Sequence, residues 1–114
     1  MTTITIDESA LESMESLLGE QFPDTLQFCC AEFERLSNEV HLNITSDLET
    51  ALRNAHSLKS NAAQFGATSL SEVARGIELS LGEQDVTTAI LVADDLSAQV
   101  AGSQAKLKEW LAGR

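Results

Sequence analysis

His56 has neighbours that suit it to carry a phosphoryl group. It lies in a stretch that we expect to be helical, so the ammonium of Lys59 and the small side chain of Ser60 share its face, with Ala63 a turn further on. A neutral imidazole can act as a nucleophile near pH 7, since its ordinary pKa is about 6.5. A nearby cation offsets the charge that phosphoryl oxygens carry in the transition state. A nucleophile, a cation and little steric cover together indicate phosphoryl transfer.

The helix that carries His56 is predicted to place this residue at its edge. Ser46 to Glu49 form a capping box at its start, and Gly66 is the natural stop. Its expected core stripe is Leu48, Ala51, Leu52, Ala55, Leu58, Ala62 and Phe65. At about 100° per residue, His56 lies roughly 130° from the centre of that stripe. The imidazole should therefore project from the flank, with Lys59 between it and the core.

The N-terminal part of the chain predicts one short and one long helix. A capping box at Thr5 to Glu8 opens the short helix, which ends near Leu18, before Gly19. Pro23 suits the first turn of the long helix. The apolar stripe of the long helix is Phe22, Leu26, Cys29, Phe33, Leu36, Val40 and Ile44.

The C-terminal part predicts two further long helices. One begins near Thr68 or Ser69 and buries Leu70, Val73, Ala74, Ile77 and Leu81. After a turn over residues 82–85, Asp85 caps a last helix from Val86 to about Ala112. Its expected apolar face is Ile90, Ala93, Leu96, Val100, Leu107 and Leu111.

These helices predict an all-α fold in one domain over residues 1–114. Hydrophobic residues make up 43% of the chain, with one proline and no tyrosine, a composition that favours helices over sheet. A chain of this length buries roughly 60 to 70% of its unfolded surface, so it needs no metal or disulfide. Four long helices with short connections predict an antiparallel up-and-down four-helix bundle, with the short N-terminal helix against one end.

The charge of the chain excludes some classes of partner. The net charge is −11, which argues against nucleic acid and anionic membranes, because both need a basic footprint. Residues 51–77 are the exception, since they carry Arg53, Lys59 and Arg75 against the single acid Glu72. The segment around His56 is thus net basic and would attract a phosphate group and an acidic partner surface. Chance placement of few charges is the alternative.

No targeting or membrane-spanning segment is visible. Residues 1–6 lack a basic region followed by an apolar run, and no window approaches the roughly 20 apolar residues of a membrane span. We expect a cytoplasmic protein. The start at Met1 and the capped terminal helices favour a free-standing protein.

A metal or redox protein is an alternative reading that would use Cys29, Cys30, His41 and His56. Ligands in helical bundles converge on the interior, however, and His56 projects off the core stripe. Cys29 lies in a core stripe, which favours a buried structural thiol. His41 lies off the stripe near the end of its helix, which favours interaction with the helix carboxyl end. We therefore expect no metal and no cofactor of the protein's own.

The residues around His56 resemble the signature of histidine-containing phosphotransfer (HPt) domains. That signature reads histidine, any residue, leucine, lysine, glycine, and a further glycine several residues later. The chain matches it at His56, Leu58, Lys59, Gly66 and Ala67. It departs at Ser60, where the family usually has glycine. That position requires little bulk, which serine still provides, so we expect function to survive the difference.

The resemblance, which covers essentially the whole chain, implies roles for two more side chains. Lys59 would stabilise the charge of the phosphoryl group. Glu78, on the following helix, would orient the imidazole through its other ring nitrogen. A solvated glutamate in contact with Arg75 or a neighbouring helix is the alternative for Glu78.

A phosphorelay intermediate is the function that the resemblance implies. His56 would accept a phosphoryl group from the phosphoaspartate of a receiver domain and pass it to another receiver domain, in response regulators or hybrid kinases that bring their own Mg²⁺. No nucleotide-binding pattern is visible, so we expect no enzyme with its own ATP site. The alternative is a non-catalytic helical module that docks on a receiver domain or kinase without phosphoryl turnover. We expect a monomer whose candidate docking contacts are Arg53, Ser57, Ser60, Ala63, Gln64 and Arg75.

Overall fold

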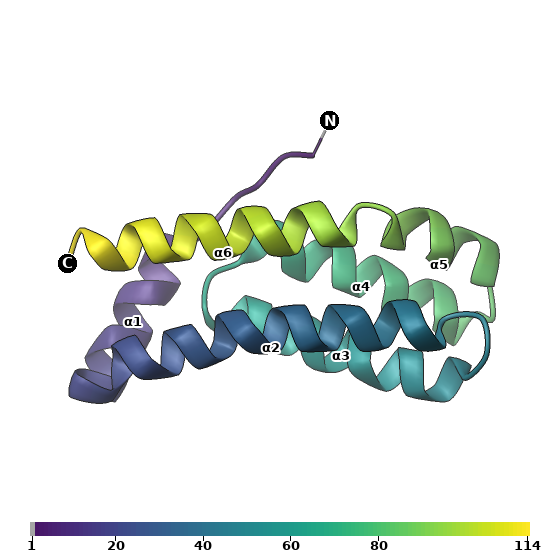
Figure 1. Ribbon diagram of the computed structural model, residues 1–114, viewed down its shortest axis with the longest axis horizontal. Helices are drawn as coiled ribbons and strands as arrows, with labels where there is room; N and C mark the ends of the chain where they lie inside the picture. The colour runs from purple at the N-terminus through teal and green to yellow at the C-terminus, as the bar shows by residue number, and fades with distance from the viewer. Residues whose placement is uncertain (1) are drawn as a thin grey trace.

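The computed structural model describes residues 2–114, in which every regular element is helical (Figure 1). The elements are α1 (Glu8–Leu18), the 3₁₀ turn η1 (Gly19–Gln21), α2 (Phe22–Asn43), α3 (Leu48–Gln64), α4 (Thr68–Gly82), α5 (Val86–Ala93) and α6 (Leu96–Ala112). The predicted all-α class is confirmed. None of the helices in the described residues is both long and apolar enough to span a membrane.

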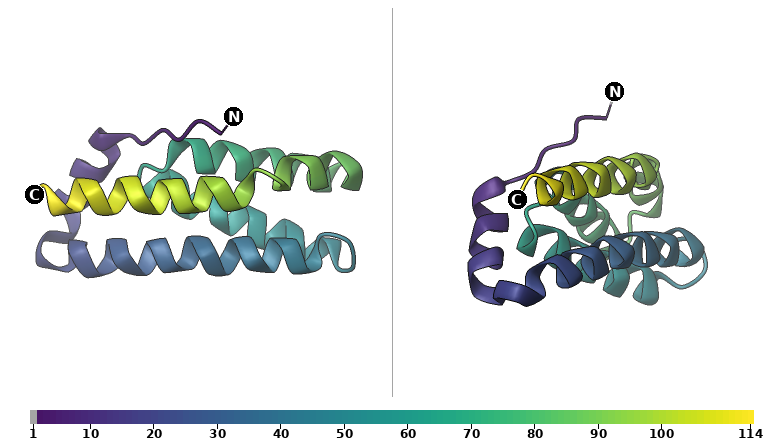
Figure 2. Two further views of the ribbon diagram at one scale, coloured as in Figure 1. Left: turned by 45° about the horizontal axis from the view of Figure 1, so that its top comes forward. Right: turned by 60° about the vertical axis from the view of Figure 1, so that its left-hand side comes forward.

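A four-helix bundle forms the body of the molecule. Helix α3 packs chiefly on α4 and α2, while α6 packs on α2 and α4. Helix α5 continues the line of α6, and α1 crosses one end of the bundle (Figures 1 and 2). The predicted antiparallel bundle with a short additional N-terminal helix is confirmed.

The core contains nearly all of the predicted apolar stripes. All seven stripe residues of α2 are buried, and so are Leu70, Ala74, Ile77 and Leu81 of α4. On α3, Leu48 and Leu52 are partly buried and the other five stripe residues are buried. The exception is Ile90, which is exposed, while Ala89 beside it takes the buried position.

The caps of two helices differ from the prediction by one or two residues. Helix α1 is capped by Asp7, whose carboxylate accepts the N–H of Ser9 at 3.0 Å, and not by Thr5. Helix α3 is capped by Asp47, which accepts the N–H of Thr50 at 3.2 Å, and not by Ser46. An aspartate nearer to the first turn provides a charged acceptor beside the positive end of the helix dipole. Asp85 caps α5 as predicted.

The predicted last helix is broken in two at Asp94 and Asp95. At the break, the N–H of Asp95 bonds to the carbonyl of Val92, three residues earlier, at 3.2 Å. Aspartate is a weak helix former, because its side chain competes for hydrogen bonds near the backbone. The Asp95 carboxylate accepts hydrogen bonds from the Thr2 hydroxyl and from the side chain of Gln99.

Residues 2–7 form an extended segment that periodicity did not predict (Figure 2). The carbonyl of Ile4 accepts Lys106 Nζ at 2.9 Å, and an added Cβ at Gly102 of α6 would meet the Ile4 side chain at 2.5 Å. The N–H of Thr5 donates to Ser69 Oγ at 2.9 Å. This segment therefore connects the start of α4 to α6.

The single tryptophan lies at the end of the bundle that α1 crosses. The ring of Trp110 meets that of Phe22 edge to face, with centroids 5.8 Å apart. Arg114 lies over the indole at 4.4 Å and also pairs with Glu15 of α1 at 2.6 Å. These contacts join α1, α2 and α6.

The turn between α3 and α4 requires glycine at position 66. Gly66 has φ +76°, and an added Cβ would lie 2.5 Å from the Asp7 carbonyl oxygen. We expect Gly66→Ala to lower the free energy of unfolding by about 2 to 4 kcal/mol, because strain and a backbone clash add. Gly82→Ala is the matched control, since no atom lies within 4 Å of its added Cβ. Urea unfolding that shows equal effects for the two variants would contradict this account.

Candidate functional site

The candidate site lies where α3 and α4 pack together. The two helices are joined by the short turn at Gly66, whose carbonyl accepts the N–H of Asp7 at 2.7 Å. Further along the pair, Ser71 Oγ donates to the carbonyl of Lys59 at 3.0 Å. These bonds set the register of α4 against α3, which brings the outer edges of the two helices together.

Three predicted residues meet at this edge. His56 Nδ1 contacts Glu78 Oε2, and Lys59 Nζ donates to Glu78 Oε1 at 2.6 Å. The His56 side chain is 59% exposed, whereas those of Lys59 and Glu78 are 29% and 20% exposed. The imidazole is therefore held at one edge and open to solvent at the other.

The contact with Glu78 determines which ring nitrogen of His56 is available. An ionised carboxylate can only accept hydrogen bonds, so Nδ1 must carry the proton. In a neutral imidazole Nε2 then has the free lone pair. The arrangement therefore presents Nε2 as the nucleophile.

Electrostatics keep Glu78 charged. Burial on its own would raise the pKa of the Glu78 carboxyl, but the hydrogen bonds and charges of Lys59 and His56 outweigh it and lower this pKa below its usual value. With a neutral imidazole, the carboxylate and the ammonium of Lys59 cancel each other's charge. The alternative pairing of Glu78 with Arg75 is not present in residues 2–114.

The predicted docking residues lie on α3 and α4, the two helices that carry the candidate site. Arg53, Ser60, Ala63 and Gln64 on α3 and Arg75 on α4 are exposed, while Ser57 is partly buried. Within residues 2–114, neither arginine makes a salt bridge. An open, cationic surface therefore borders the imidazole.

Two exposed apolar residues on α2 and α4, the helices that pack on α3, were missed by the sequence reasoning. Phe28 of α2 is 66% exposed and lines a small hollow with Asn61 of α3 and with Phe65, the residue that follows α3. Leu79, next to Glu78 in sequence, is 52% exposed. A large apolar residue off its core stripe was the signal that could have found both.

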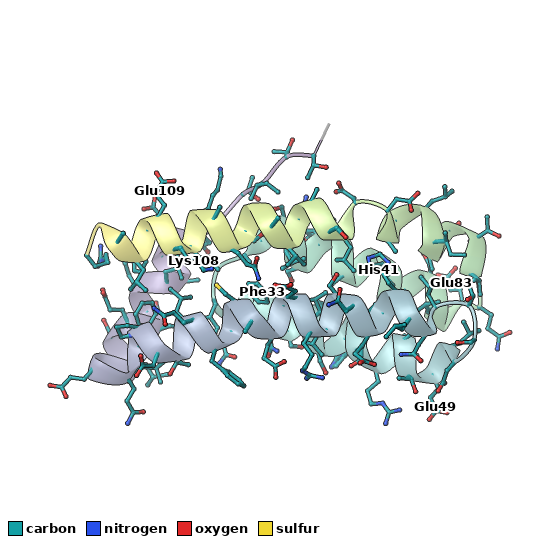
Figure 3. The ribbon with its side chains drawn as sticks, viewed as in Figure 1. Phe33, His41, Glu49, Glu83, Lys108 and Glu109 are labelled. Carbon is teal, nitrogen blue, oxygen red and sulfur yellow. The ribbon has the colours of Figure 1, made fainter. Side chains whose placement is uncertain are left out.

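The four residues that a metal or redox site would use, Cys29, Cys30, His41 and His56, do not form one cluster in the described part of the chain. Cys29 and Cys30 are buried, and the Cys29 thiol faces the carbonyl of Asn61 at 3.8 Å. His41 lies on the exposed surface of α2, near its C-terminal end (Figure 3). No group of three or more potential metal ligands occurs in the described part of the chain.

Comparison with known proteins identifies the family. The Hpt domain family matches residues 8–108, nearly the whole chain. The chain belongs to the Hpt domain family, and it is a histidine phosphotransfer module of phosphorelays. Hpt proteins are phosphotransfer carriers without an ATP site of their own, and they interact with receiver domains in two-component systems.

Solved structures support the same fold. The crystal structure of histidine-containing phosphotransfer protein B (HptB) from Pseudomonas aeruginosa PAO1 matches with a TM-score of 0.88 at 18% identity, over 96% of each chain. A histidine-containing phosphotransfer protein from maize matches with a TM-score of 0.79 at 14% identity, over 96% of this chain and 90% of the maize chain. By sequence, no curated protein matches.

The buried thiols should be unreactive in the folded protein. Burial, together with the charges of Cys30 and Glu32, raises the pKa of the Cys29 thiol to about 12, and burial also raises the pKa of Cys30. Because the thiolate is the reactive form, we expect Ellman's reagent at pH 8 to label neither cysteine within minutes. In guanidinium chloride both should react. Rapid labelling of the folded protein would contradict this prediction.

The Glu78 contacts should stabilise the protein in a pH-dependent way. The pKa of Glu78 is lower in the folded protein than its usual value. The contribution of Glu78 to the free energy of unfolding is therefore fully present above the pKa that this group has in the unfolded chain. It is lost as the pH falls through the pKa that Glu78 has in the folded protein. We expect Glu78→Gln to lower the free energy of unfolding at pH 7 by about 1 kcal/mol or less, and by a smaller amount at pH 3.

The matched control for this prediction is Glu72→Gln, which removes the same charge from α4. Glu72 makes no salt bridge among residues 2–114. Denaturant unfolding of both variants at the two pH values gives the comparison. A Glu78→Gln effect that grows as the pH falls would refute the assigned contacts.

Proposed function

We propose that His56 is the phosphoacceptor and phosphodonor of this Hpt domain, and that it relays a phosphoryl group between two receiver domains. The observation that carries the proposal is the contact between Nδ1 and Glu78, which leaves Nε2 as an exposed nucleophile. The surrounding small and exposed side chains leave room for a partner domain to reach it.

In the proposed step, the Nε2 lone pair attacks the phosphorus of a receiver phosphoaspartate. A P–N bond forms while the bond between phosphorus and the aspartate oxygen breaks, and the carboxylate leaves with the electron pair. The proton on Nδ1 stays in place, so the step consumes and releases no proton. The reverse step donates the phosphoryl group to a second receiver domain by the same exchange.

Each partner contributes part of the charge stabilisation. On this chain, Lys59 would offset the charge of the phosphoryl oxygens. On the receiver domain, a bound Mg²⁺ would neutralise the phosphoryl group and the leaving carboxylate. Because the phosphoryl group comes from the receiver domain, the relay requires no ATP site and no cofactor on this chain.

The docking surface in this proposal is the region around His56. Arg53 and Arg75 would attract the acidic phosphorylation pocket of a receiver domain. Ser57, Ser60, Ala63 and Gln64 would lie under it. We further propose that the protein acts as a monomer in the cytoplasm.

Phosphoryl transfer from labelled receiver domains tests the proposal. We expect an acid-labile label to appear on the wild-type protein and on His41→Gln, and to fall to background in His56→Gln. Screening every receiver domain of the source organism would identify the partners by their transfer rates. A label that persists in His56→Gln would reject the assignment.

The alternative, a docking module without turnover, is motivated by Ser60 in place of the usual glycine. It predicts that binding to a receiver domain survives in His56→Ala and that no donor produces phosphohistidine on the wild-type protein. The same labelling experiment therefore separates the two functions. Ser60→Gly shows whether the hydroxymethyl group slows transfer.

A further inference from the structure

Both carboxylate oxygens of Glu78 are occupied in the unphosphorylated protein. Oε2 accepts from the imidazole, and Oε1 accepts from Lys59 Nζ at 2.6 Å. Lys59 lies three residues after His56 on the same helix face, and its ammonium is already paired with Glu78 before any phosphoryl group arrives. A fully paired ammonium is a weaker partner for an incoming phosphoryl group than a free one.

We propose that Glu78 holds Lys59 in the unphosphorylated protein, and that Lys59 exchanges Glu78 Oε1 for a phosphoryl oxygen when His56 is phosphorylated. This inference rests on the proposed function of His56. It gives Glu78 a second role as a positioning residue that acts through Lys59, in addition to orienting the ring.

The exchange is possible because of where the three groups lie. Lys59 is one helical turn from His56, and its four-carbon stem lets the ammonium swing between neighbouring acceptors. A phosphoryl group on Nε2 carries more negative charge than the single charge of Glu78, so it competes for the ammonium. Glu78 is 20% exposed, so water can replace Lys59 at Oε1.

The ring does not need to move during this exchange. The bond between Nδ1 and Oε2 is unaffected, because phosphorylation takes place at the other nitrogen. Glu78 therefore continues to hold the imidazole while its second oxygen releases the lysine. Until that release, the cations of α3 and α4 without an acidic partner are Arg53 and Arg75, which make no salt bridge within residues 2–114.

A double-mutant cycle tests the exchange without a partner protein. The four proteins are the wild type, Lys59→Met, Glu78→Gln and the double variant, each phosphorylated by phosphoramidate, a small donor whose P–N bond breaks to release ammonia. Glutamine keeps a carbonyl oxygen for Nδ1 but removes the charge that holds Lys59. We expect Lys59→Met to slow phosphorylation of His56 at least five times more in the Glu78→Gln background than in the presence of Glu78.

The cycle cancels effects that do not pass through Lys59. Glu78→Gln could also change the reactivity of the ring or the direct repulsion between residue 78 and the phosphoryl group. These effects are the same whether Lys59 or Lys59→Met is present, so they cancel in the cycle. Glu72→Gln, combined with Lys59→Met in the same way, controls for the loss of one negative charge on α4. This control cycle should show no coupling. Circular dichroism checks that each variant is folded.

The outcome of the cycle distinguishes the inference from the function on which it rests. If His56 is phosphorylated and Lys59→Met slows it by the same factor in both backgrounds, Glu78 does not hold Lys59 and the inference is overturned. If the wild-type protein acquires no phosphohistidine from phosphoramidate or from any receiver domain, the proposed function itself fails. NMR provides a direct readout, because a coupling between Lys59 Nζ and ³¹P should appear only after phosphorylation.

Discussion

The antiparallel contact between α3 and α4 is the constraint on which the site depends. His56 and Lys59 come from one helix and Glu78 comes from the other, so their meeting requires a single register between the two. A shift of one residue along α4 would turn Glu78 by about 100° away from the imidazole. The turn at Gly66 and the bond from Ser71 to the Lys59 carbonyl set this register.

Much of the fold could be predicted because the buried face of a helix requires apolar residues at every third or fourth position of the sequence. The stripe from Phe22 to Ile44 is buried along its whole length, since each of its residues faces the bundle. Helix ends were predicted less accurately. Thr5 and Asp7 both lie before α1, and either could cap a helix; the charged side chain closer to the first turn does so. The break at Asp95 was missed because the apolar spacing continues across it.

The candidate site was partly predictable for a related reason. The positions of His56 and Lys59 on one face follow from helical geometry within one segment. The contact with Glu78 depends on how two helices pack, which the apolar spacing within each helix does not determine. The role of Glu78 was therefore predicted from the family resemblance. In the extended segment over residues 2–7, partly buried and exposed residues alternate, but this short pattern does not indicate which helices the segment contacts. Its bonds join residues as distant as Ile4 and Lys106, so only the folded structure shows them.

The packing of Trp110 determines what intrinsic fluorescence can report about this protein. The chain has one tryptophan and no tyrosine, so nearly all of its ultraviolet emission comes from the indole between Phe22 and Arg114. That indole senses the attachment of α1 to the end of the bundle, and it is on a different helix from His56. An emission change would therefore follow unfolding or detachment of α1, whereas chemistry at the imidazole needs a probe placed on α3 or α4.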